Sequence, residues 1–502
     1  MSLRMERKVP RKGGAWAFAV SCLVALAVWA ALPNRDGHAQ QPETRPAVSG
    51  SAPPSAEPVP TAPAPTDSAA PSASPEAPPA LPPPPDRLKV FILTFSPGDH
   101  PFYKFGHNAI WIHDESQRNP MFRDKVYNYG MFSFGDPKLI PKFFLGRFMY
   151  WLDADPYSHT VRVYKHENRA IESQELDLSP AQELELQRLL EENLKEENKK
   201  YKYDYYRDNC STRVRDMIDK VTGGRVRAAA TEPQRLTYRQ QTLRLTESLP
   251  AEYVILNFVM GSLIDQPGTR WEESFIPMEF QETLRHVTLV DESGAERPIV
   301  KEEKLLLPSK QTPPPKDPPT WWPYSLLAGL GIGGLLAGIG HAAVKNTRLR
   351  IVFGLLLSFF GLLWGFFGIF FLAAWAFTDH AVGYHNENTL LSVPWAIVLV
   401  GTGINVARSR VKSTERAHLL IKLALGSSLL GLVLKVLPWF DQANGFFLLF
   451  FIPFWAGAFY GSHQLVTKVA RVASAAVAGK AGAKKPKKKA ATPPPPADRA
   501  ED

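Results

Sequence analysis

The sequence YDYYRDNCSTRVRD, residues 203–216, predicts a helix that begins close to a cysteine. Asp208 or Asn209 can cap this helix, and the two glycines at 223–224 are typical of a helix end. Cys210 therefore lies in the first turn and shares an inward face with residues about one turn apart, namely Val214, Ile218 and Val221. Unpaired backbone N–H groups and the helix dipole favour a thiolate there, so we expect a lowered pKa for Cys210.

Long apolar runs fill the chain from Tyr324 onward, and each has about the 20 residues that a helix needs to cross a bilayer. Five such runs are predicted, at 324–344, 351–377, 390–407, 417–437 and 445–462. Buried helices of a soluble protein are the alternative, but helices this apolar on all sides would need a far larger protein to cover them. The sequence therefore indicates an integral membrane protein with an all-α bundle of five helices at 324–465.

Basic residues mark one side of these runs. They occupy the connections after the first and third runs and the tail at 466–502, and the net charge of +9 largely reflects them. The other connections, 378–389 and 441–444, contain no Lys or Arg. The positive-inside bias therefore places the tail in the cytoplasm and residues 87–323 outside. Nucleic-acid binding is disfavoured, because the lysine-rich tail lacks interleaved aromatics and a folded platform.

The N-terminal part of the chain predicts export. A basic start precedes an apolar run at 15–32, so residues 1–39 are predicted to be a signal peptide or signal anchor. Residues 40–86 are dominated by Pro, Ala and Ser, which predicts an extended linker. We therefore expect a multi-pass membrane protein with the next domain outside the cytoplasm.

Residues 87–310 are predicted to form one soluble domain, and 311–323 to link it to the apolar runs. Short stretches rich in β-formers predict strands at 88–95, 107–114, 125–132 and 159–166. A helix follows, with Ser179 as its N-cap, Pro180 in the first turn and Gln182 completing a capping box. The mixture predicts an α+β domain.

The thiol of Cys210 has no disulfide partner in this domain, because the only other cysteine, Cys22, falls in the N-terminal apolar run. An unpaired exported cysteine is a candidate reactive thiol, although a buried cysteine that acts as a small apolar side chain is the alternative. A cysteine nucleophile needs a base, usually a histidine, and the domain offers His100, His107, His113, His159, His166 and His286. Spacing alone does not select among them, although His107 is best placed, at the start of a strand that looks buried on both faces.

Three segments of the domain resemble a known family. They are KFGHNAIWIHD at 104–114, VYNYGMFSF at 126–134 and YKYDYYRDNCSTRVRDMID at 201–219. A histidine that starts a core strand, followed much later by Asn-Cys opening a helix, resembles circularly permuted papain-like folds. More specifically, most of 88–285 resembles the periplasmic domain of Lnb-type lipoprotein N-acyltransferases, and the external loop TDHAVGYHNENTLL at 378–391 extends the likeness.

The resemblance implies a membrane-bound acyltransferase that works through a thioester. It implies Cys210 as the nucleophile, His107 as the general base and Asn128 as the group that orients the imidazole. The donor is then a phospholipid, and the acceptor is the N-terminal cysteine amine of a diacylglyceryl lipoprotein. Four loop residues that resemble the family's motif are predicted to bind substrate, namely His380, His385, Asn386 and Asn388, with a polar cap on two spans as the alternative. No cofactor or metal is predicted, since the loop lacks H-E-x-x-H spacing and a nearby cysteine.

Two other functions are compatible with the sequence. A phospholipase or a cell-wall cysteine peptidase would use the same residues, with water in place of the amine. Several spans and a polar external loop favour a lipid over peptidoglycan, since a wall peptidase would need only a tether. A non-enzymatic envelope sensor or scaffold is the other alternative, and it predicts that Cys210→Ser leaves function intact.

Overall fold

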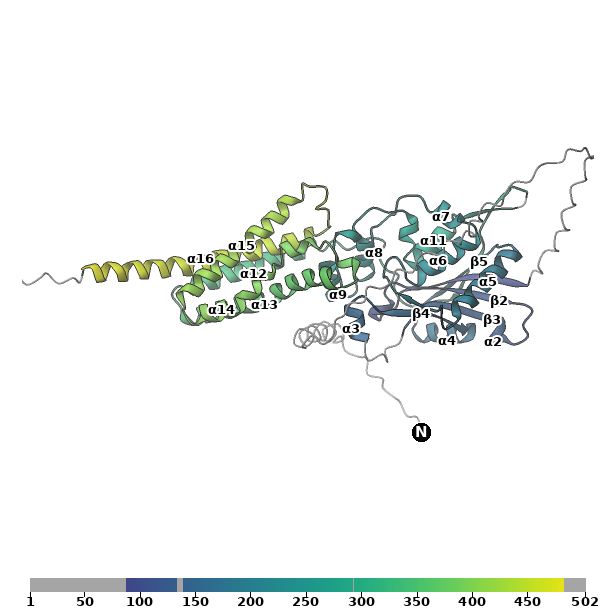
Figure 1. Cartoon of the computed structure of the whole chain (residues 1–502), viewed down its shortest axis with the longest axis horizontal. Helices are drawn as coiled ribbons and strands as arrows, with labels where there is room; N and C mark the ends of the chain where they lie inside the picture. The colour runs from purple at the N-terminus through teal and green to yellow at the C-terminus, as the bar shows by residue number, and fades with distance from the viewer. Residues whose placement is uncertain (1–86, 133–138, 292, 483–502) are drawn as a thin grey trace, which may run out of the picture. The chain divides into compact units, whose positions relative to one another are not determined.

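The computed structural model describes residues 87–132, 139–291 and 293–482 (Figure 1). The predicted leader at 1–39 and linker at 40–86 lie outside these residues, as does the lysine-rich end of the predicted tail. The described residues all belong to one structural unit of the chain, Asp86–Asp502. We refer to residues 87–310 as the sheet domain.

An antiparallel sheet of seven strands forms the centre of the sheet domain, in the order β6-β4-β3-β2-β1-β5-β9. Its strands are β1 (Leu88–Phe95), β2 (His107–Asp114), β3 (Asp124–Met131), β4 (Met149–Pro156), β5 (Ile171–Leu176), β6 (Lys200–Lys202) and β9 (Val300–Leu307). A separate pair consists of β7 (Thr288–Val290) and β8 (Glu296–Pro298). Strands β1, β2 and β3 confirm three of the four predicted strands.

The two faces of this sheet bind different helices, as Figure 1 shows. Val90 and Ile92 point to the face on which α5, α6 and α11 pack, whereas Leu93 and Phe95 point to the face that α4 covers. These helices are α4 (Tyr157–His166), α5 (Pro180–Leu194), α6 (Cys210–Val221) and α11 (Pro277–Leu284). The predicted capping box of Ser179 starts α5, and Asn209 caps α6, so α6 begins at the cysteine as predicted.

Residues 159–166, predicted as a strand, belong to the helix α4. Tyr157, Val161 and Tyr164 recur at helical spacing and pack on the sheet face that carries Phe95. Val163, which gave the sequence its alternating pattern, is exposed. The strand prediction was wrong because two spaced valines match a strand in a short window, whereas the buried residues follow the period of a helix.

Short helices complete the sheet domain. They are η1 (Pro101–Tyr103), α2 (Pro120–Arg123), α3 (Leu139–Phe144), α7 (Arg225–Ala229), α8 (Tyr238–Leu245), α9 (Pro250–Val259), η2 (Ser262–Ile264) and α10 (Arg270–Glu273). Arg239 of α8 holds the end of α9, since its buried guanidinium pairs with Asp265 and donates to the carbonyl oxygens of Asn257 and Met260. Helix α9 therefore has a fixed C-terminus, which the membrane region contacts.

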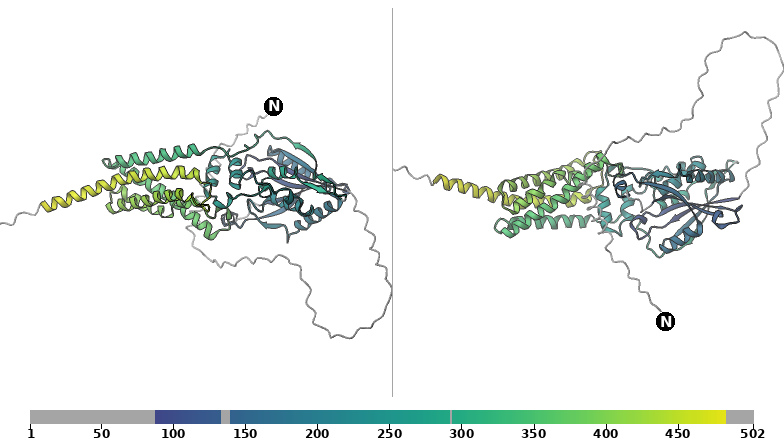
Figure 2. Two further views of the ribbon diagram at one scale, coloured as in Figure 1. Left: turned by 90° about the horizontal axis from the view of Figure 1, so that it is seen from above. Right: turned by 60° about the horizontal axis from the view of Figure 1, so that its bottom comes forward.

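Four helices after the sheet domain are long and apolar enough to cross a membrane. They are α12 (Trp322–Ala342), α13 (Thr347–Phe377), α15 (Val411–Leu434) and the first part of α16 (Gly445–Gly482). Figure 2 shows them running alongside one another, and many of their apolar side chains, such as Leu327, Phe359 and Leu429, face outward. Such exposure suits contact with lipid. These helices match four of the five predicted runs.

Residues 390–407, predicted as a further span, do not form one long helix. The segment contains the 3-10 turns η4 (Glu387–Leu390) and η5 (Pro394–Val398), followed by the short helix α14 (Leu399–Ala407). Among the described residues, four helices rather than five therefore have the length of a membrane span.

Glycines of α13 leave a groove for this broken segment. A Cβ on Gly368 would lie 2.2 Å from the carbonyl oxygen of Ser392, and a Cβ on Gly354 would lie 2.4 Å from that of Gly403. Gly354 and Gly368 are about 21 Å apart along α13 at 1.5 Å per residue. The broken segment thus follows α13 over most of the thickness of a bilayer's apolar core.

Candidate functional site

Cys210 is fixed at the start of α6 by two sets of polar contacts. Asn209 accepts a hydrogen bond from the backbone N–H of Thr212 at 2.9 Å, and the Thr212 hydroxyl accepts one from the backbone of Asn209 at 2.8 Å. Ser211 Oγ lies 2.8 Å from Asn108 Oδ1 of β2 and 2.7 Å from the carbonyl oxygen of Ser274. The first turn of α6 is therefore tied to the beginning of β2, next to His107.

The sulfur meets the sheet where two strands separate. The pairing of β2 with β3 runs from His113 and Asp124 to Ile110 and Tyr127, and it stops short of the beginning of β2. Beyond this point β3 forms a bulge against β4 that includes Gly130, whose φ is +89°. Bulges often re-aim a strand beside a functional site.

Gly130 lies directly against Cys210. A Cβ built on Gly130 would lie 3.3 Å from Cys210 Cβ, which is a tight contact. The positive φ also disfavours any residue with a side chain. The bulge therefore makes room for Cys210 at the open end of the β2/β3 pair, and only a glycine leaves that room.

His107 and Asn128 face each other on the side of the sheet that α4 covers. Asn128 Oδ1 lies 3.2 Å from His107 Nε2, and Asn128 Nδ2 donates to the carbonyl oxygen of Val126 at 3.3 Å. The second bond fixes which amide atom faces the imidazole. Nε2 of His107 therefore carries the proton, and Nδ1 is left as the acceptor.

The surroundings keep His107 neutral. Its pKa falls from 6.5 to about 4, first because the ring is buried and second because of the positive charge of Arg169, while the bond to Asn128 acts in the opposite direction. Phe95 stacks on the ring at 5.6 Å between centroids. An uncharged imidazole at neutral pH is the form that can accept a proton.

The pKa of Cys210 is raised, contrary to the expectation from its position on a helix. Burial is the largest cause, and it outweighs the backbone N–H groups of Asn108, Ser211 and Cys210, which favour the thiolate as expected. The expectation failed because the sequence shows the helix end but not the packing around it. The residue keeps partial solvent exposure, so the resting thiol is neutral and partly accessible.

Arg169 is a site residue that the sequence did not reveal. Its side chain is only 3% exposed, and its guanidinium lies over the ring of Tyr164 at 4.6 Å, while Nε donates to the carbonyl oxygen of Ser96 at 2.7 Å. Among the described residues, its Nη2 atom has no hydrogen-bond partner. The positive charge favours the thiolate of Cys210 and disfavours a charged His107. No motif marks this arginine, because it reaches the site only through the fold.

The four predicted residues of the external loop lie in different surroundings. His380 Nε2 lies 2.6 Å from the carbonyl oxygen of Phe143, whereas His385 is exposed and its ring lies 5.0 Å from that of Trp375. The amide groups of Asn386 and Asn388 are buried and each donates to the carbonyl oxygen of Phe258 at 3.0 Å. The two asparagines thus bind the loop to the end of α9, whereas His380 lines a pocket.

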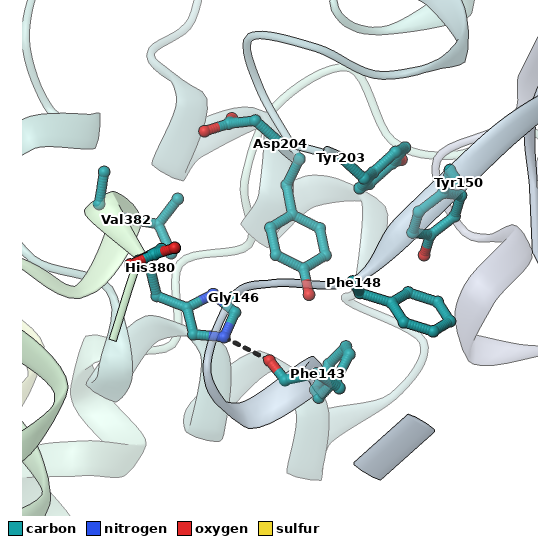
Figure 3. Close-up of a pocket in the computed structure, with 11 residues that line it drawn as sticks. Phe143, Gly146, Phe148, Tyr150, Tyr203, Asp204, His380 and Val382 are labelled. Atoms are coloured by element: carbon teal, nitrogen blue, oxygen red, sulfur yellow. Dashed lines mark hydrogen bonds between the residues drawn. The ribbon is translucent and has the colours of Figure 1, made fainter. Parts of the chain in front are cut away.

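The pocket beside His380, which we call the aromatic pocket, is a small hollow of about 20 Å³ that is open to solvent. Figure 3 shows aromatic rings from the sheet domain opposite His380 and Val382 of the loop. It is lined by Phe143, Gly146, Phe148, Tyr150, Tyr203, Asp204, Tyr205, Asp379, His380, Ala381 and Val382. A charge on Cys210 is among the causes that raise the pKa of Tyr150 and Tyr203. Within the described residues, no group of three or more His, Cys, Asp or Glu side chains is placed to hold a metal ion.

Comparison with known proteins identifies the domain that carries this arrangement. Residues 83–246 match the family model of the Lnb N-terminal periplasmic domain. The match includes Cys210, His107, Asn128 and Arg169, and it ends before the membrane helices and the external loop. No curated protein and no solved structure matches the chain. With four span-length apolar helices among its described residues, the protein is a multi-pass membrane protein that has a periplasmic domain of the Lnb family.

Proposed function

Because this chain carries an Lnb N-terminal periplasmic domain, we propose that it is a membrane-bound, cysteine-dependent lipoprotein N-acyltransferase. Its donor is a phospholipid, and its acceptor is the N-terminal cysteine amine of a diacylglyceryl lipoprotein. One observation supports this most: α6 brings Cys210 to the backbone of Asn108, the residue that follows His107, and the imidazole of His107 lies 3.2 Å from Asn128 Oδ1. The membrane in question is the bacterial inner membrane, and the sheet domain has a permuted papain-like fold.

In the first half of the reaction, an ester bond is exchanged for a thioester. Nδ1 of His107 takes the thiol proton as the sulfur of Cys210 attacks the ester carbonyl carbon. The tetrahedral intermediate collapses, the carbon–oxygen bond to glycerol breaks, and the imidazolium returns its proton to the leaving oxygen. The product is an acyl group on Cys210 and a free lysophospholipid.

In the second half, the amine of the acceptor attacks the thioester. His107 takes a proton from the amine nitrogen, the carbon–sulfur bond breaks, and Cys210 regains the proton as its thiol forms again. The backbone N–H groups at the start of α6, which favour negative charge on the sulfur, also suit the oxyanion of both intermediates. No oxidant, reductant or cofactor enters this sequence.

The neutral state of the pair fits a general-base mechanism. With the pKa of His107 lowered to about 4 and that of Cys210 raised, proton transfer accompanies attack and does not precede it.

The membrane helices keep the enzyme at the bilayer, where the acyl chains of both substrates are anchored. A soluble enzyme would have to extract each chain from the bilayer at about 0.8 kcal/mol per CH₂.

Mass spectrometry of lipoprotein N-termini tests the proposal. In cells with this protein as the only candidate acyltransferase, the wild type is expected to give N-acylated termini and Cys210→Ser to give free amines. Cys22→Ser is the matched control and is expected to behave as the wild type. Free amines in cells that contain the wild-type protein would remove the transferase, and lysophospholipid release in the same cells would then identify a phospholipase.

A further inference from the structure

We infer that α9 lies in the interfacial layer of the bilayer, where Val254 and Ile255 contact phospholipid. The helix belongs to the sheet domain, so this contact seats that domain directly on the membrane. Figure 1 shows α9 where the membrane helices meet the sheet domain. The inference adds a lipid-contacting surface outside the four membrane helices, and it does not depend on the proposed function.

The C-terminal end of α9 packs among the membrane helices. The buried ring of Phe258 lies 4.7 Å from that of Phe447, which belongs to the first turn of α16. It also lies 5.2 and 5.1 Å from the rings of Phe367 and Phe371 of α13. Phe371 comes about 9 Å before the end of α13, at 1.5 Å per residue. The end of α9 therefore lies below the top of the membrane helices.

The middle of α9 lies at the height where α12 begins. The ring of Tyr253 lies 4.4 Å from that of Trp321, the residue that precedes α12, and 6.3 Å from that of Phe446 in α16. The first turn of α12 also exposes Trp322 and Tyr324. Trp and Tyr side chains at the ends of membrane helices are typical of the headgroup layer. Tyr253 is therefore level with the lipid headgroups.

Two exposed residues of α9 lie between these two heights. Val254 and Ile255 follow Tyr253 and precede Phe258, a segment that covers about 7.5 Å along a helix. Each of the two side chains is 38% exposed. A bilayer surrounds the membrane helices on all sides at this height, so a side chain that the protein leaves uncovered there meets lipid. The height decides this point, because single exposed apolar residues are also common on surfaces that face water.

The distribution of polar groups on α9 fits contact with lipid on one side. Asn257 is buried on the opposite side, where its Oδ1 accepts a hydrogen bond from Arg239 at 2.9 Å. Glu252 is the one charged residue of α9, and it lies in the first turn, at the end away from Phe258. The helix therefore presents only apolar side chains where it approaches the membrane helices.

The surroundings of Glu252 agree with this position. Burial raises the pKa of its carboxyl group, and the positive charge of Lys104 acts in the opposite direction. A carboxyl group with a raised pKa takes up a proton more readily, so it tolerates the edge of a bilayer better than an ordinary glutamate does.

The contact also reaches the segment that carries Cys210. The hydroxyl of Tyr206, four residues before the cysteine, lies 2.9 Å from Thr242 Oγ1 of α8 and 3.3 Å from the sulfur of Met260, which directly follows α9. Tyr206 and Tyr253 also belong to the same apolar cluster. A bilayer contact at α9 is therefore connected through one layer of packed side chains to the residues that open α6.

Spin labelling in proteoliposomes tests the inference without requiring catalysis. In the full-length protein, both native cysteines are replaced by serine, and Ile255→Cys then carries a nitroxide label. Oxygen concentrates in the bilayer, whereas a nickel chelate stays in water, so the collision rates of the label with the two reagents report its surroundings. We expect the label at position 255 to collide often with oxygen and to lose most collisions with the nickel chelate.

Two exposed leucines supply the references. Leu305→Cys marks water, since Leu305 is 61% exposed on the edge strand β9, and Leu327→Cys marks lipid, since Leu327 is 64% exposed on α12. Val254→Cys repeats the measurement at the neighbouring position, in case one α9 variant does not fold. Both α9 labels are expected to be protected from the nickel chelate, as the label at Leu327 is, and to differ from the label at Leu305.

The vesicles contain only this protein and phospholipid, so each outcome identifies what covers α9. Protection from the nickel chelate with free access of oxygen supports contact with lipid. Collisions with the nickel chelate as frequent as those at Leu305 would overturn the inference, because α9 would then face water. Protection from both reagents, or dipolar broadening between labels on two molecules, would also overturn it, since protein or a second copy of the chain would then cover the helix.

Discussion

Replacing Gly130 by alanine should impair the reactivity of Cys210 more than the fold. The substitution has two separate costs. The backbone is held at φ +89°, which a residue with a Cβ resists, and the added Cβ meets Cys210 Cβ at 3.3 Å. The backbone strain would arise at any glycine with a positive φ, whereas the contact affects Cys210 alone.

Both costs can be given a magnitude. A left-handed backbone costs a residue with a Cβ roughly 1–2 kcal/mol, and this lowers the free energy of unfolding. The contact must be relieved by a shift of Cys210 of a few tenths of an ångström, and misplacement of reacting groups costs about tenfold to 100-fold in rate. Gly224→Ala is the matched control, because Gly224 has φ +87° and a Cβ there would meet nothing within 4 Å.

The assay measures stability and reactivity in the same preparations. Thermal unfolding in detergent micelles should show a similar loss for both variants. Alkylation of Cys210 by iodoacetamide and its acylation by para-nitrophenyl butyrate should slow only in Gly130→Ala. Equal rates in the two variants would refute the claim that the β3 bulge positions the nucleophile.

Three further predictions follow from the site. Asn128→Ala should slow Cys210 acylation about tenfold, the equivalent of about 1.4 kcal/mol for one lost hydrogen bond, and an unchanged rate would show that Asn128 does not orient His107. Arg169→Met removes a charge that lowers the pKa of His107, so the acid limb of the pH–rate profile for Cys210 acylation should move to higher pH. Arg169→Lys keeps the charge and should leave that limb in place. An acid limb that does not move in Arg169→Met contradicts the electrostatic role. Asn388→Ala should lower the stability by about 1–3 kcal/mol in thermal unfolding, since a fully buried amide loses its bond to Phe258, and it should leave alkylation of Cys210 unaffected.

Local signals in the sequence were sufficient for the elements that carry the nucleophile. The caps Ser179 and Asn209 and the alternation in β1 to β3 depend on neighbours in the chain, and the structure confirms them. The bond between His107 and Asn128 agrees with the predicted orienting role, which remains a proposal. That pairing was accessible because both residues come from strands that follow one another in the chain.

Long-range packing decided the features that the sequence did not show. Arg169 reaches the site from a segment without any motif, and its Nη2 atom, which has no hydrogen-bond partner among the described residues, becomes visible only when its neighbours are known. The pKa of Cys210 depends on how deeply the fold buries it, and a helix position alone gives the opposite direction. Asn386 and Asn388 look like ligand-binding residues in a loop, but the carbonyl oxygen of Phe258 engages both amides.

Membrane helices were predictable by composition, apart from the segment at 390–407. Its residues are as apolar as those of the other runs, yet Pro394 and the close approach of the α13 glycines give 3-10 turns in place of a continuous helix. Hydropathy measures burial in lipid or protein and does not distinguish a long helix from a broken segment that another helix shelters.

The raised pKa of Cys210 has a consequence for the lifetime of the protein. Peroxides and disulfides attack the thiolate, and at neutral pH a thiol with a raised pKa exposes very little of it. The periplasm is an oxidising compartment, where a permanently ionised cysteine would be converted to sulfenic acid or captured in mixed disulfides. A sulfur that stays protonated at rest resists that damage without needing a repair partner.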